Sequence, residues 1–163
     1  MKANEKFAIL PYQGAGSIRF GMSPSEIKGL IGAPDQVSTN HLKQRVEFRS
    51  FMNVAYTPSM DQHSVLTHIG FGRQMEMVLI EDVNLFKDDP IGVLNRLMLV
   101  DSRPMTYLGF VVFFELGIAL TGFHDNDVSQ KAVTVFEKGA WDNRVPKMNP
   151  FEEVMGSRAM LRT

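Results

Sequence analysis

The chain contains no cysteine, and this absence excludes several kinds of site at once. Disulfides, thiolate zinc sites, iron–sulfur clusters and cysteine nucleophiles all need a thiol. An excess of charge is missing too, because the formal net charge is −1 at pH 7. A protein that binds nucleic acid through a global positive field carries many more basic than acidic residues. We therefore expect no nucleic-acid partner.

Long apolar runs are also missing. The N-terminal stretch MKANEKFAILPYQ has no apolar segment long enough for a signal peptide. The most apolar segment, residues 110–123, is interrupted by Glu115, Gly117 and Gly122. A membrane-spanning helix needs about 20 consecutive apolar residues. The sequence therefore predicts a cytoplasmic protein with no membrane partner.

What the chain does contain is ordinary for a globular protein. It has 163 residues, of which 44% are hydrophobic and 21% are charged. A chain of this length can bury a sizeable core without crosslinks. We expect one domain over residues 1–163, with a C-terminal tail over residues 141–163.

The segment SIRFGMSPSEIKGLIGAP predicts a strand, a capped helix and a stop. Ser23 is a favourable N-cap, and Glu26 three residues later completes a capping box. Pro24 occupies the first helical position, where its missing N–H costs nothing. Gly32 then ends the helix. This is the best-specified element of the chain.

A second helix is predicted from Pro90 to about Val100, with Asp88 or Asp89 as its cap. Three segments rich in β-branched and aromatic residues follow each helix. In the first of them, Val46 and Phe48 fall on one side of the strand and two charged residues on the other. The predicted strands cover residues 45–51, 52–57, 65–71, 110–114, 118–123 and 132–136. Residues 1–16 are expected to form a loose arm with a short strand at residues 7–10, and residues 35–40 are expected to form a loop. Residues 75–86 are a further extended run, whose alternation weakens near Glu81 and Asp82.

The two halves of the chain show the same order of elements. Residues 54–57 (VAYT) align with residues 118–121 (IALT), and the spacing changes only within a polar turn. We interpret residues 17–73 and 80–139 as two αβββ repeats. The predicted fold class is α+β, with one antiparallel sheet and both helices packed on one of its faces.

Two polar turns raise the question of metal or acid–base chemistry. His124, Asp125 and Asp127 lie in one turn, and Asp61 and His63 lie in the corresponding turn of the first half. A divalent cation or a His–Asp dyad would use such residues. However, the turn HDND lacks the glycine and the distal glutamate of a calcium loop, and Asp and Asn favour turns for backbone reasons alone. We therefore predict no metal, no cofactor and no catalytic residue.

The acidic turns have a second interpretation, as a surface complementary to a basic partner. Aromatic residues often anchor such interfaces. The predicted partner-binding residues are Asp61, Asp88, Asp125, Asp127, Tyr56, His124 and Trp141.

Two segments carry a resemblance to known families. SIRFGMSPSEIKGLIGAPDQV resembles the opening of small β-lactamase-inhibitor-like and outer-membrane assembly lipoprotein modules, although this chain has no cysteine to lipidate. LGIALTGFHDNDVSQKAVTVFEKG is similar to cytosolic bacterial proteins of the same plan, many of which resemble immunity partners of secreted polymorphic toxins, including those of contact-dependent inhibition.

The resemblance implies a cytosolic immunity protein that covers the active or substrate-binding surface of a cognate bacterial toxin, a nuclease being one candidate. Two alternatives remain open. One is a small-ligand-binding or enzymatic domain that uses His124 and Asp127. The other is a scaffold whose apolar sheet face forms a homodimer. The immunity protein, by contrast, is expected to be a monomer or a weak homodimer.

Overall fold

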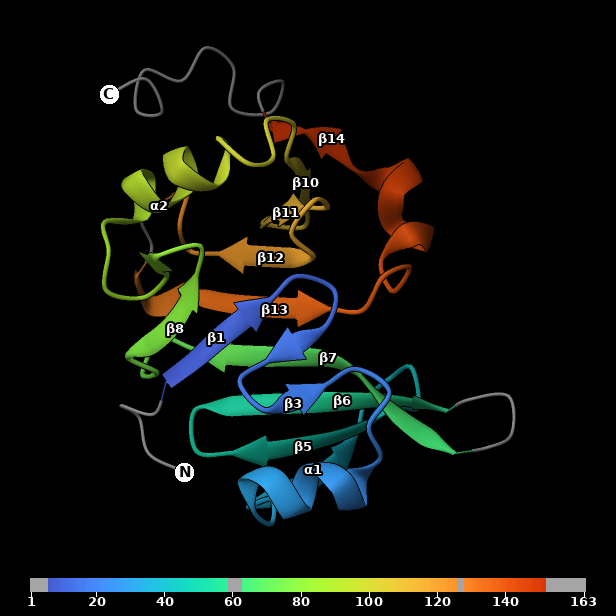
Figure 1. Cartoon of the computed structure of the whole chain (residues 1–163). Helices are drawn as coiled ribbons and strands as arrows, with labels where there is room; N and C mark the ends of the chain where they lie inside the picture. Colours follow the sequence, from blue (N-terminus) through green and yellow to red (C-terminus); the bar gives the residue numbers. More distant parts are fainter. Residues whose placement is uncertain (1–5, 59–62, 126–127, 152–163) are drawn as a thin grey trace.

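A computed structural model describes residues 6–58, 63–125 and 128–151 of the chain. In these residues a nine-stranded sheet extends through the whole molecule (Figure 1). Its strands pair in the order β14-β10-β11-β12-β13-β7-β6-β5-β4, and every pair is antiparallel. In chain order they are β4 (Gln36–Thr39), β5 (Arg45–Arg49), β6 (Met52–Pro58), β7 (Ser64–Gly72), β10 (Met105–Tyr107), β11 (Phe110–Phe113), β12 (Ile118–Thr121), β13 (Ala132–Phe136) and β14 (Asn149–Pro150).

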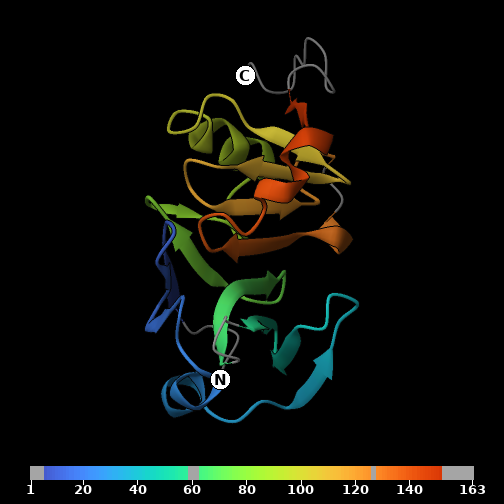
Figure 2. The same cartoon turned by 90° about the vertical axis from the view of Figure 1, so that its right-hand side faces the viewer.

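A second, smaller sheet crosses one face of the large sheet near β7 and β13 (Figures 1 and 2). Its strand order is β3-β2-β1-β8-β9, and β1 pairs with β8 in parallel while the other pairs are antiparallel. Buried apolar side chains of β1 and β8 join the main core, among them Phe7 and Val78. These strands are β1 (Lys6–Leu10), β2 (Gly14–Ala15), β3 (Ile18–Arg19), β8 (Met77–Ile80) and β9 (Val83–Asn84).

Two helices, α1 (Pro24–Ile31) and α2 (Pro90–Leu97), lie on the same face of the large sheet as the small sheet, one toward each end (Figure 1). The predicted capping box of α1 is present, because Ser23 and Glu26 bond to each other's backbone N–H groups. Asp89 caps α2 by accepting a bond from Gly92. Neither of the described helices is long and apolar enough to cross a membrane.

The α+β class and the antiparallel main sheet are confirmed, but the single six-stranded sheet is wrong. Residues 7–10, expected as a short strand in a loose arm, form part of β1, and β1 pairs with β8, which was not expected. Residues 36–39, expected as a loop, form the edge strand β4. All four β4 residues are exposed. Its sequence, QVST, therefore does not alternate between apolar and polar residues in the way that predicts a half-buried strand.

The two halves of the large sheet meet where β7 pairs with β13. Helix α1 is followed by four strands, β4 to β7, and α2 is followed by four strands, β10 to β13. Each half therefore contributes one strand more than the predicted αβββ unit.

The opposite face of the large sheet has its own, smaller core. The segment that follows β13 contains the 3₁₀ helix η2 (Asp142–Lys147) and covers this face over β11 to β13. Trp141 is 6% exposed and stacks on Phe136, while Phe110 and Tyr107 contact it edge-on. The covering segment packs on the sheet through Trp141 and Met148.

Candidate functional site

The same face continues past the covering segment onto strands β5, β6 and β7. Val112, Ala119 and Thr134 stand opposite one another across β11, β12 and β13, and Gly70 comes next on β7. The first two are buried in the smaller core, whereas Thr134 and Gly70 line a pocket. We call the uncovered part of this face, over β5, β6, β7 and the adjoining edge of β13, the open face.

The apolar side of strand β5 lies on the open face, and its charged side faces the protein interior. Phe48 is 39% exposed, whereas Glu47 and Arg49 are each only 2% exposed beneath α1. The alternation seen in the sequence is therefore real, but the charged side is the buried one. Burying charged groups is costly unless they are paired and hydrogen-bonded, so the contacts beneath α1 must account for this orientation.

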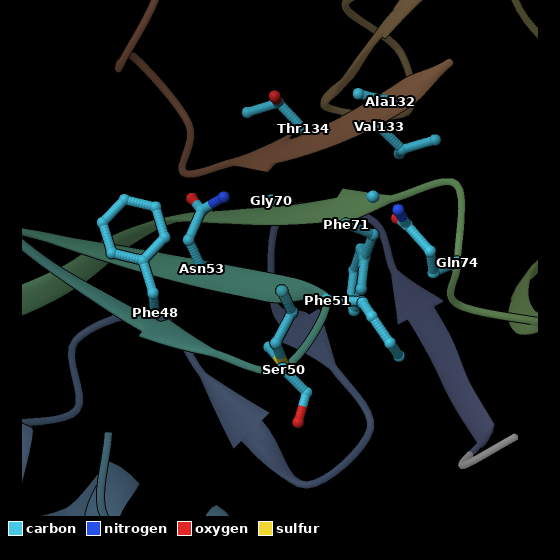
Figure 3. Close-up of a pocket in the computed structure, with 12 residues that line it drawn as sticks. Phe48, Ser50, Phe51, Asn53, Gly70, Phe71, Gln74, Ala132, Val133 and Thr134 are labelled. Carbon is cyan, nitrogen blue, oxygen red and sulfur yellow. The ribbon is translucent and has the colours of Figure 1, made fainter. Parts of the chain in front are cut away.

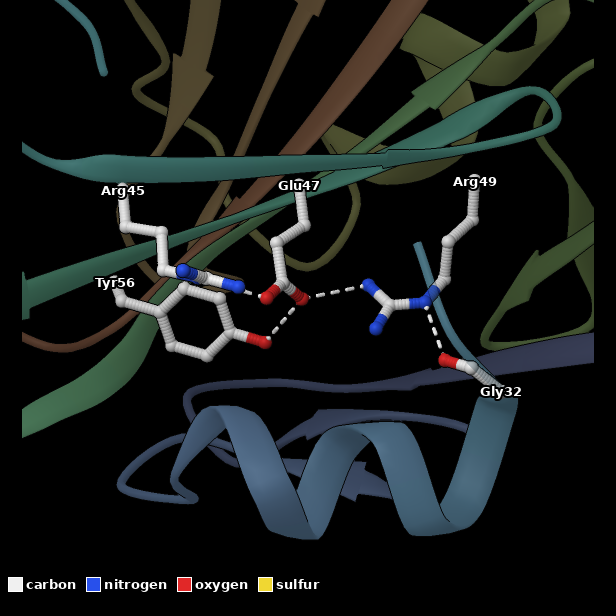
Figure 4. A network of polar contacts seen from close by, with 5 residues as sticks. All are labelled: Gly32, Arg45, Glu47, Arg49 and Tyr56. Atoms are coloured by element: carbon white, nitrogen blue, oxygen red, sulfur yellow. Dashed lines mark hydrogen bonds and ion pairs between the residues drawn. The ribbon is translucent and has the colours of Figure 1, made fainter. Parts of the chain in front are cut away.

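A network of polar contacts between the large sheet and α1 satisfies the buried carboxylate (Figure 4). Glu47 Oε1 accepts bonds from Arg49 Nη1 and Tyr56 OH, each at 2.8 Å, and Oε2 accepts one from Arg45 Nε at 2.9 Å. Arg49 Nε also donates to the carbonyl of Gly32 at the end of α1. Burial would raise the pKa of Glu47, but the three hydrogen bonds outweigh it and hold this pKa below its usual value.

One end of the open face forms a pocket of about 370 Å³ beside Phe48, the Phe48 pocket (Figure 3). Phe48, Asn53, Gly70 and Thr134 stand in one row across four neighbouring strands. A Cβ atom at Gly70 would lie 2.8 Å from the side-chain amide of Asn53. The glycine therefore lets Asn53 lie low over the floor of the pocket, while Phe48 and Phe51 flank it.

The other end forms a more polar pocket of about 420 Å³, the His68 pocket. A β-bulge between β6 and β7 places Thr67 and His68 together on it. A chain of hydrogen bonds runs from Gln44 through Thr57 and Thr67 to His68 Nδ1. The Thr67 hydroxyl lies 2.9 Å from His68 Nδ1 and 3.4 Å from the Ala55 carbonyl. We assign its single proton to the shorter contact, which makes Nδ1 an acceptor and places the imidazole proton on Nε2.

His68 should make the protein lose stability in mild acid. Burial, together with the nearby Arg144 charge, lowers the pKa of His68 to about 4, whereas an unfolded chain protonates histidine near pH 6.5. The unfolded state therefore binds more protons between these values, and the free energy of unfolding should fall as the pH is lowered from about 6.5 to 4. Urea titrations across this range should show a flatter profile for His68→Asn. An equally steep profile in that variant would contradict the assignment, and exposed His41→Gln is the control that should match the wild type.

Two of the predicted anchors are buried. Tyr56 is fully buried and bonded to Glu47, and burial followed by that carboxylate raises its pKa. Trp141 lies in the smaller core. A partner could reach neither side chain without displacing α1 or the covering segment.

The structure describes two of the four predicted acidic residues. Asp61 and Asp127 lie outside the described residues. Asp88 accepts a bond from the backbone of Asn84 and lies 4.0 Å from Arg96, so it supports the turn before α2. Asp125 is exposed. Among the described residues, no three His, Asp or Glu side chains are grouped to hold a metal ion.

His124 lines a third pocket, of about 460 Å³, with Tyr107, Phe110 and Lys147. Its Nδ1 is buried without a hydrogen-bond partner, and its ring contacts Phe151 edge-on. The sequence prediction therefore found a residue at a pocket, but the residues of the open face were missed. The alternation of apolar and charged residues along β5 was visible in the sequence, but alternation alone does not show which side of a strand is exposed to solvent.

Comparisons of the chain with protein-family models, with curated proteins and with solved structures find no match. The resemblance of residues 17–37 and 116–139 to inhibitor-like and immunity proteins stays a prediction.

Proposed function

We propose that this protein acts by binding another protein on its open face, and that the partner is a cognate secreted bacterial toxin whose active or substrate-binding surface becomes covered. The observation that supports the proposal most is the set of exposed apolar side chains on β5 and in the turns at its two ends. Phe48 and Phe51 are each 39% exposed beside one pocket, and Leu42 is 54% exposed beside the other.

These side chains fit the usual composition of an interface. The buried centres of interfaces are enriched in aromatic residues and depleted of charged ones. Here Phe48 and Phe51 surround a floor of small or uncharged residues, among them Asn53, Gly70 and Thr134. An apolar loop or side chain of a partner would fill this pocket and exclude water from it. The toxin as partner class rests on the sequence resemblance.

Phe48→Asp should weaken partner binding by about thirtyfold or more, the effect of losing a central aromatic anchor. The test is co-purification and then calorimetry with the product of the adjacent gene. Because Phe48 is partly exposed, the variant should keep its fold. Leu99→Asp, at an 86% exposed leucine just after α2, is the matched control and should bind as the wild type does.

Two outcomes would count against the proposal. If the adjacent gene product does not bind the wild-type protein, the partner assignment loses its support. If Phe48→Asp binds as tightly as Leu99→Asp, the open face is not the interface.

A second candidate function is ligand binding or catalysis at His124. The buried, unpartnered Nδ1 in a pocket with Lys147 favours it. A thermal-shift screen distinguishes it from the first, because a specific metabolite or ion should raise the melting temperature by several degrees. The expected loss of that shift in His124→Ala would place the ligand at this pocket.

We also propose that the two halves arose from one duplicated unit. The support is that a helix followed by four antiparallel strands occurs twice, and that the last strands of the two units, β7 and β13, pair with each other.

A further inference from the structure

Arg144 brings an uncompensated positive charge to the His68 pocket. Its guanidinium lies over the indole of Trp141, 4.6 Å from the ring centroid. Within the described part of the chain its side chain has no carboxylate or carbonyl partner, and Nη1 is buried without a hydrogen bond. Stacking fixes the plane of the guanidinium and leaves its donors free to bind an acceptor.

His68 supplies a second, neutral donor to the same pocket. Its Nδ1 is occupied by Thr67 Oγ1 at 2.9 Å, so the N–H is on Nε2. Nε2 has no partner among the described residues and is not among the buried unpaired atoms. It is therefore accessible, and with Arg144 it forms a pair of donors suited to a carboxylate.

Glu137 adds a negative charge to the lining. Its backbone N–H bonds to Thr67, which fixes its position at the end of β13. No Lys or Arg lies within ion-pair distance of its carboxylate in the described residues, and partial burial raises its pKa. The lining thus holds one acidic residue, Glu137, and two basic residues, Arg144 and the exposed Lys138, and none of these three forms an ion pair within the described part of the chain.

We propose that the His68 pocket binds a small molecule that carries both a carboxylate and a protonated amine, in its simplest form a free α-amino acid. The carboxylate accepts hydrogen bonds from Arg144 and from His68 Nε2–H, and the ammonium group donates to Glu137. A simple carboxylate would leave Glu137 uncompensated and a simple amine would leave Arg144 uncompensated, whereas a molecule with both groups satisfies both side chains at once. The pocket volume lies within the range of small-molecule sites.

This ligand site goes beyond the proposed function, because it requires no protein partner. It lies at the opposite end of the open face from the Phe48 pocket, and the two pockets share no lining residue. Binding of an amino acid can therefore be measured on the isolated protein.

The test is a titration of the full-length, isotope-labelled protein with each of the twenty L-amino acids, followed by NMR of the His68 imidazole and the Arg144 side chain. We expect at least one amino acid to give saturable shifts of both. Acetate and methylammonium, tested separately, should each bind at least about tenfold more weakly, because each leaves one charge uncompensated. Absence of saturable shifts with every amino acid, or acetate binding as tightly as the best one, would overturn the proposal.

Variants assign the two charged contacts. Arg144→Gln and Glu137→Gln should each weaken the best amino acid by about tenfold or more. Lys28→Gln, at an exposed residue of α1 that does not line the pocket, should leave its affinity unchanged. Backbone amide spectra verify that each variant is folded. If both glutamine variants bind like the wild type, the ligand does not use these groups; partner binding and its loss in Phe48→Asp are measured separately, so either proposal can fail alone.

Discussion

Replacing Glu47 by alanine should lower the free energy of unfolding by about 3–5 kcal/mol. The variant leaves Arg49, only 2% exposed, without its carboxylate, and it also removes the acceptor of the buried Tyr56 hydroxyl. A folded domain has about 5–15 kcal/mol of stability in total, so this loss is a large part of it. Urea unfolding at pH 7 measures the change, and the melting temperature should fall by about 6–20 °C.

The control removes both buried charges together. In the double variant Glu47→Leu, Arg49→Met the space is filled by apolar side chains, and replacing a whole ion pair in this way is often close to neutral. We therefore expect the double variant to be markedly more stable than Glu47→Ala. If the double variant is as unstable as the single one, shape rather than unpaired charge determines the cost.

Replacing Trp141 by alanine should lower the free energy of unfolding by about 3–5 kcal/mol, the usual cost of deleting a buried large aromatic side chain. The indole stacks on Phe136 and is contacted edge-on by Phe110 and Tyr107, so alanine would leave a cavity between the covering segment and the sheet. In Trp141→Ala, hydrogen exchange should become faster relative to the wild type, and the increase should be larger in residues 137–150 than in β6.

Trp141→Phe is the matched control. It keeps a stacked ring and removes the indole Nε1–H, which is buried without a partner. The phenylalanine variant should therefore lose much less stability than the alanine variant. If both variants lose the same stability, the contacts that a phenylalanine ring keeps with its aromatic neighbours contribute little.

The helices could be predicted from the sequence because their signals are local. Ser23 and Glu26 lie three residues apart and bond to each other, and Pro90 follows its cap directly. The tight turn between β8 and β9 also left a local sign, since the strand alternation weakens at Glu81 and Asp82, which both have positive φ angles. The end of α2 was placed about three residues too late, because exposed Leu99 and Val100 extend its apolar pattern.

The candidate site could be predicted only in part. A period of two showed that Phe48 and Glu47 point to opposite sides of β5, but the buried side is decided by contacts from α1 and Tyr56. His68 lies on this face by the same alternation as Gly70, whereas Thr67 reaches the pocket at a β-bulge, and no residue type marks that bulge in the sequence. The extended segments at residues 7–10 and 75–86 could be predicted, but their pairing into the small sheet could not, since β1 pairs with β8 about 70 residues later in the sequence.

The pairing of β7 with β13 has a consequence for the newly made chain. Strand β7 ends at Gly72, and its partner begins at Ala132, about sixty residues later. At ordinary synthesis rates of about 5–20 residues per second, one edge of β7 waits about 3–12 s for its partner. During that time a long, apolar strand edge is available to other chains. Production of the protein should therefore depend on chaperones that bind nascent chains.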